Sequence, residues 1–174
     1  IVKKYDSDGL VGGEAPLTND LIEIADTDFR NVNIASILAI FVIILILFKS
    51  PVLPVLLVLA IELAIYINLG IPYYMGTSIP FISSIVIGTI QLGATVDYAI
   101  LLTSRFKEEL AKNTDKSEAM RVSLQSSSRS IITSALIFFG ATAGVGIISD
   151  MEMISSLCTL MARGAIISMF VILF

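Results

Sequence analysis

Long apolar runs alternate with short polar connections along this chain. A helix that crosses the hydrocarbon core of a bilayer needs about 20 mostly apolar residues. Five runs approach or exceed that length, and they cover residues 33–48, 52–69, 79–104, 130–148 and 151–174. Five such runs at nearly regular spacing predict an all-α membrane protein with a five-helix transmembrane bundle, and they argue against buried helices of a large soluble domain.

Lysine and arginine in the connections predict the orientation of the bundle. The turn between the first two runs carries Lys49, and residues 105–129 carry six basic residues, whereas residues 70–78 and 149–152 carry none. Because cytoplasmic loops are enriched in these residues, the two basic connections are expected in the cytoplasm. The connection 105–129 has helical character, which fits an interfacial helix and a solvated linker equally well.

The residues before the first run are expected outside the membrane. Residues 1–15 contain glycines and show no helical period, as in the last strand and turn of a folded domain, whereas residues 16–29 have an amphipathic helical period. We therefore divide the chain into 1–32, the end of an extracytoplasmic domain with a connecting helix, and 33–174, the transmembrane domain. The start at Ile1 and the apolar end indicate a segment of a longer protein.

The composition supports a membrane protein and disfavours other classes. Hydrophobic residues make up 56% of the chain, charged residues 15%, and the mean hydropathy is +0.91. The net charge of −4 comes without a basic patch, so nucleic acid is not an expected partner. The chain has no histidine, no cluster of metal ligands and no phosphate-binding loop. We therefore expect that the protein is not an enzyme and that it binds no metal and no cofactor.

Three ionisable side chains lie in the middle third of the predicted membrane: Glu62, Asp97 and Arg163. Such residues are rare at this depth and face a bundle interior, a partner or a water-filled cavity. Desolvation favours the neutral form of a carboxylate, so Asp97 is a candidate proton-relay residue, with a purely structural role as the alternative. Glu62 and Arg163 have matching depths, and we expect them to pair with each other as supporting structural residues.

Small residues accompany Asp97, and in lipid they let helix backbones approach each other closely. The expected packing positions, on the third and fourth runs, are Gly88, Gly93, Ala94, Gly140 and Gly144. Near the inner end of the fourth run, Thr133 and Ser134 are supporting polar candidates. Asp97 is therefore expected to point at a neighbouring helix, and the hydroxyl of Tyr98 is available to a partner.

The stretch GATVDYAILLTSRFKEEL, residues 93–110, resembles the fourth-helix signature of the MMPL branch of the resistance-nodulation-division (RND) transporters. Asp97 and Tyr98 match the mid-helix pair of that signature, and Arg105 with Glu108 and Glu109 match its cytoplasmic end. Two later stretches, SSSRSIITSALIFFGATAGVG and LMARGAIISMFVILF, resemble the fifth and sixth helices of the same family.

The resemblance implies two repeats of six helices, each with a large extracytoplasmic porter domain after its first helix. This chain would then hold the end of one porter domain and the last five helices of one repeat. Asp97 and Tyr98 would meet the matching pair of the absent repeat and carry protons. The implied function is proton-driven export, and the implied partners are the second repeat, protons and a lipid or other hydrophobic substrate, in a bacterial plasma membrane.

Two other functions stay open at this stage. Sterol-sensing and Patched-like proteins share the implied fold, so the chain could be a lipid-sensing or scaffolding module that does not pump. Accessory subunits of Sec-type protein export have a similar helix, but there the aspartate is followed by a small residue and asparagine, whereas Asp97 is followed by Tyr98.

Overall fold

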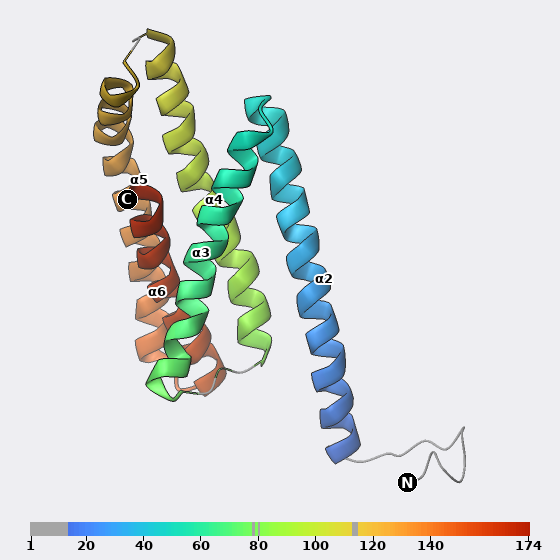
Figure 1. The fold of residues 1–174 in the computed structure, drawn as a ribbon. Coiled ribbons are helices and arrows are strands. Elements are labelled where there is room, and N and C mark those ends of the chain that lie inside the picture. Colours follow the sequence, from blue (N-terminus) through green and yellow to red (C-terminus); the bar gives the residue numbers. More distant parts are fainter. Residues whose placement is uncertain (1–13, 78, 80, 113–114) are drawn as a thin grey trace.

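The computed structural model describes residues 14–77, 79, 81–112 and 115–174. Apart from short connections, these residues are α-helical, and they contain no strand. The helices are α2 (Glu14–Phe48), α3 (Val52–Met75), α4 (Phe81–Lys112), α5 (Lys116–Ile148) and α6 (Glu152–Leu173), as Figure 1 shows. Each contains a stretch long and apolar enough to cross a membrane. The predicted all-α bundle with five membrane helices is therefore confirmed.

Helix α2 is longer than the sequence predicted. The pattern suggested a separate amphipathic helix over residues 16–29 and a span that starts at Asn33, but α2 runs without interruption from Glu14 to Phe48. After Pro16 the helix contains neither glycine nor proline, so nothing in its backbone stops helix propagation across the polar residues near its middle. The strand and turn predicted for residues 1–15 fall almost entirely outside the described residues.

The cytoplasmic connection predicted at 105–129 is mostly helix. α4 and α5 continue through it and are separated only by residues 113–115. Figure 1 shows the resulting hairpin extending past the turn between α2 and α3. At its tip Asp115 caps α5, because its Oδ1 accepts a 3.0 Å hydrogen bond from the backbone N–H of Ser117. The connection is thus an extension of two membrane helices and not a separate helix along the interface.

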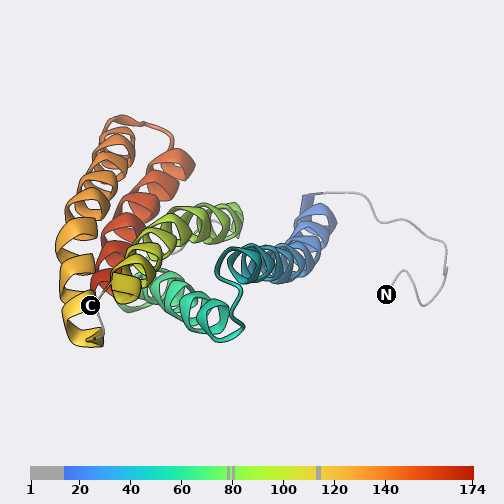
Figure 2. The ribbon, with the colours of Figure 1, turned by 90° about the horizontal axis from the view of Figure 1, so that it is seen from above.

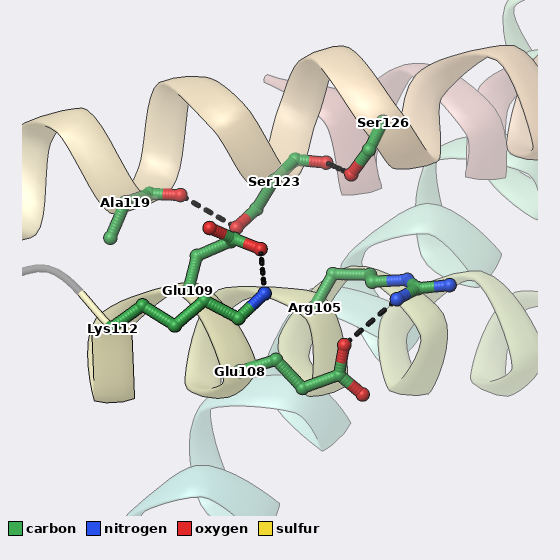
Figure 3. Close-up of polar contacts among 7 residues, drawn as sticks. All are labelled: Arg105, Glu108, Glu109, Lys112, Ala119, Ser123 and Ser126. Carbon is green, nitrogen blue, oxygen red and sulfur yellow. Dashed lines mark hydrogen bonds and ion pairs between the residues drawn. The ribbon is translucent and has the colours of Figure 1, made fainter.

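Charged pairs one helical turn apart line this hairpin. Arg105 lies 2.8 Å from Glu108, and Lys112 lies 2.8 Å from Glu109, as Figure 3 shows. The side chain of Glu109 is 19% exposed, and in Figure 3 it points toward α5. Exposed pairs of this kind add only a few tenths of a kcal/mol each, about 0.3–0.5 kcal/mol, so they shape the hairpin surface without deciding the fold.

Helices α3, α4 and α6 form the middle of the bundle. Figure 2 shows α2 along one edge, with α5 and α6 at the opposite side. Only 11% of the most apolar 18-residue stretch of α2 is buried. One core cluster, between α3 and α4, consists of Ile61, Ile65, Leu92, Val96 and Ala99. The other, between α4, α5 and α6, consists of Tyr98, Leu102, Ile131, Ala135 and Met169. Many large apolar side chains instead face outward, among them Ile46, Leu59, Ile137 and Ile147, as expected for helices in lipid.

Candidate functional site

A groove between α4 and α5 holds the candidate proton site. Its volume is about 470 Å³, and Asp97 is the only carboxylate among the described residues that line it. The lining residues are Ala94, Asp97, Tyr98, Leu101, Ile131, Ser134, Ile137, Phe138 and Ala141. Asp97 is exposed on the groove side of α4. Tyr98, one residue further round the helix, is 7% exposed and packs into the core with Leu102 and Met169.

Asp97 has no counter-charge in this groove. None of the ion pairs or hydrogen bonds found among the described residues involves its carboxylate, and no lysine or arginine is among the residues that line the groove. A carboxylate at membrane depth requires a partner, water or a proton. The arrangement therefore leaves the Asp97 carboxylate without a partner among the described residues.

Two of the supporting candidates have different environments. Ser134 lines the Asp97 groove from α5. Thr133, by contrast, donates a 2.8 Å hydrogen bond to the backbone carbonyl of Arg129 in its own helix, so its hydroxyl is engaged locally. The structure thus brings Ser134, but not Thr133, to the groove wall that faces α4.

The predicted glycine positions make no close helix contact among the described residues. A Cβ atom added at Gly88, Gly93, Gly140 or Gly144 would find no neighbouring atom within 4 Å. Their packing against a second repeat stays a prediction. The close approaches occur elsewhere. A Cβ on Gly146 would lie 3.0 Å from Thr159 Oγ1, and one on Gly164 would lie 2.7 Å from both Asn68 Nδ2 and Gln91 Oε1.

The expected pairing of Glu62 with Arg163 is wrong. Arg163 Nε donates to Asn68 Oδ1 at 2.8 Å, and its Nη2 donates to the backbone carbonyl of Asn68 at 2.9 Å. Glu62 Oε1 is buried without a hydrogen-bond partner among the described residues. Matching depth was a poor guide because it ignores rotation: Asn68 lies six residues after Glu62, about 240° around α3.

A buried polar network, which the sequence reasoning missed, joins α3, α4 and α6. Asn68, Gln91, Thr95 and Ser168 are each at most 5% exposed. Asn68 Nδ2 donates to Gln91 Oε1 at 2.8 Å, and Gln91 Nε2 donates to Ser168 Oγ at 3.1 Å. The available signal was the presence of amide and hydroxyl side chains at membrane depth, where they hydrogen-bond across helices. The prediction considered mainly the ionisable residues at membrane depth and so did not include these side chains.

Comparison with known proteins agrees with this architecture. Residues 6–173 match the MMPL family over almost the whole chain. The chain belongs to the MMPL family. This confirms the resemblance seen in the Asp97-Tyr98 segment and places the five-helix bundle in a membrane.

Two relatives of this MMPL chain illustrate the relationship. The membrane protein YdgH of Bacillus subtilis is 31% identical over 144 residues, which are 77% of this chain and 16% of YdgH. The trehalose monomycolate exporter MmpL3 of Mycolicibacterium smegmatis is 28% identical over 134 residues, which are 76% of this chain and 13% of MmpL3. This chain therefore spans only a small part of the length of the relatives it matches.

Proposed function

We propose that this chain is the membrane part of one repeat of a proton-driven MMPL exporter for lipids or other hydrophobic molecules, located in the bacterial plasma membrane. Asp97 carries the proposal, because its carboxylate faces an apolar groove at membrane depth without a counter-charge. The relative named as a trehalose monomycolate exporter supports export of a lipidic molecule.

In this proposal Asp97 alternates between charged and neutral forms. When the carboxylate is charged, it draws water or a donor group from the second repeat into the groove; when it takes up a proton, the groove can close as an apolar contact. The ring of Tyr98 is held in the core, and Tyr98 also lines the groove, so its hydroxyl is the proposed relay partner. Ser134 offers a second polar group on the opposite wall. The resulting change in helix packing would drive the outer domain.

The test replaces Asp97 with asparagine in the whole transporter and measures export of a lipidic substrate at normal protein levels. Asp97→Asn is expected to abolish proton-driven export, because the amide cannot bind and release a proton in the same way. Asp150→Asn is the matched control, since Asp150 is exposed in the connection between α5 and α6. Undiminished export by Asp97→Asn would refute the proposal.

The same variant separates a pump from a scaffolding or lipid-sensing module. The Asp97 carboxylate makes no hydrogen bond or ion pair among the described residues, so the fold of this chain does not depend on it. Asp97→Asn is therefore expected to reach the membrane in normal amounts and to keep its unfolding midpoint. A large loss of folded protein would instead favour the structural role.

A further inference from the structure

In the polar network that crosses α3, α4 and α6, every amide hydrogen of Asn68 and Gln91 has an acceptor. Asn68 Nδ2 donates to Gln91 Oε1 at 2.8 Å and to the Leu160 carbonyl at 3.0 Å. Gln91 Nε2 donates to the Ala64 carbonyl at 3.2 Å and to Ser168 Oγ at 3.1 Å. Both hydrogens of each amide are thus in use. The Asn68 oxygen is also used, because it accepts from Arg163 (2.8 Å), as described above.

Thr95 links α4 to α6 at the same level. Its Oγ1 lies 2.7 Å from Ser168 Oγ and 2.6 Å from the backbone carbonyl of Gln91. Thr95, Ser168 and Asn68 are fully buried. In an apolar bundle such a network has few alternative arrangements, because any rotation that breaks it leaves buried amides and hydroxyls without partners.

The backbone of α6 is shaped around the two amides. Gly164 lies so close to them that a Cβ would come within 2.7 Å of Asn68 Nδ2 and of Gln91 Oε1. The absence of a side chain at Gly164 therefore lets three helices meet at one point, with Gln91 at the centre of the contact. This point holds α4 against both α3 and α6.

The network lies directly before Asp97 in α4. Thr95 precedes Asp97 by two residues, and successive residues of a helix lie about 100° apart. With Thr95 and Gln91 held inward, Asp97 faces the groove and Tyr98 enters the core. A rotation of α4 by one residue, about 100°, would carry Asp97 into the direction that Tyr98 now takes, toward the core.

We propose that Asn68, Gln91, Thr95 and Ser168 are positioning residues that fix the rotation of α4 and thereby aim Asp97 into the groove. Their interhelical bonds set which side of α4 faces α5, and none of them lines the groove itself. The inference rests on the proposed function in one respect, because the proposed function makes Asp97 the residue that binds the proton. The geometry itself is independent of transport.

Few titratable groups lie in the groove beside Asp97. Asp97 and Tyr98 are the titratable residues that line it, and α5 contributes Ser134 and apolar side chains. The charged residues of α3 and α6 within the membrane, Glu62 and Arg163, do not line it. A change in the titration of Asp97 on altering the network therefore reports the environment of Asp97.

The experiment measures labelling of Asp97 by dicyclohexylcarbodiimide, which modifies protonated carboxyl groups, in the purified full-length transporter. Mass spectrometry of the Asp97 peptide at a series of pH values gives the pH of half-maximal labelling, which is independent of the amount of folded protein. Thr95→Val removes the hydroxyl at nearly constant volume. It is expected to turn Asp97 toward the packed helices, where the charged form is disfavoured, and so to raise the half-labelling pH.

Two further variants make the result specific. Thr95→Ser restores the hydroxyl and is expected to return the half-labelling pH to its original value. Thr142→Val is the matched control, because Thr142 bonds only to carbonyls of its own helix, and it should leave the pH unchanged. If Thr95→Val does not fold, Ser168→Ala removes the other partner of the same contact.

The outcomes separate this inference from the proposed function. An unchanged half-labelling pH in Thr95→Val, or no recovery in Thr95→Ser, overturns the positioning role even if Asp97→Asn abolishes export. A raised pH that Thr95→Ser reverses supports the positioning role even if export proves independent of Asp97, in which case only the proposed function falls.

Discussion

Replacing Gly164 with alanine tests the three-helix contact most sharply. The added Cβ would lie 2.7 Å from Asn68 Nδ2 and from Gln91 Oε1, the two atoms that form a 2.8 Å hydrogen bond. Neither amide can move aside freely, because each is held by further bonds. Overpacking costs about 1–3 kcal/mol, and loss of an interhelical hydrogen bond in a membrane costs about 0.6 kcal/mol on average.

The matched control is Gly70→Ala, two residues from Asn68, where an added Cβ meets nothing within 4 Å. Both substitutions gain the same helix propensity, about 1 kcal/mol, so that gain cancels in the comparison. Gly164→Ala should therefore be less stable than Gly70→Ala by about 2–4 kcal/mol. Equilibrium unfolding in mixed micelles with increasing dodecyl sulfate measures the difference. Equal stability of the two variants would show that the network does not hold the helices as described.

Two further predictions concern contacts between helices. Lys107 donates a 3.0 Å hydrogen bond to the Phe48 carbonyl and lies 5.2 Å from the Phe48 ring centre, so Lys107→Ala should weaken the C-terminal end of α2 by about 1 kcal/mol. Faster amide exchange there, with no change in the middle of α2, is the expected result, and unchanged exchange would contradict it. A double-mutant cycle for Arg163→Met with Asn68→Leu should give a coupling of about 1–2 kcal/mol. A cycle for Arg163→Met with Glu62→Gln should give a coupling of about zero. A strong coupling would instead indicate an ion pair between Glu62 and Arg163.

The bundle was predictable because apolar length is a local property. The apolar run 52–69 predicted a helix that starts near Val52, and α3 starts there. The continuous α2 was not predicted, because the pattern changes from amphipathic over 16–29 to apolar from residue 33. Such a change does not by itself end a helix, and residues 17–48 contain no glycine or proline.

The site was predictable only in part. Asp97 could be singled out because a carboxylate in an apolar run is conspicuous in the sequence. The network around Gln91 was missed because its members come from three helices, and their meeting depends on the rotation and register of each. The error over Arg163 has the same origin: depth along a helix follows from counting residues, whereas the direction of a side chain follows from tertiary packing.

The most direct test of Asp97 as the proton carrier is proton flux through the full-length transporter in liposomes that contain a pH-sensitive dye. With a proton gradient and substrate present, we expect flux for the unaltered protein and for Asp150→Asn, and none for Asp97→Asn. Flux through Asp97→Asn at the rate of the unaltered protein would show that the carboxylate in the α4–α5 groove does not carry the proton.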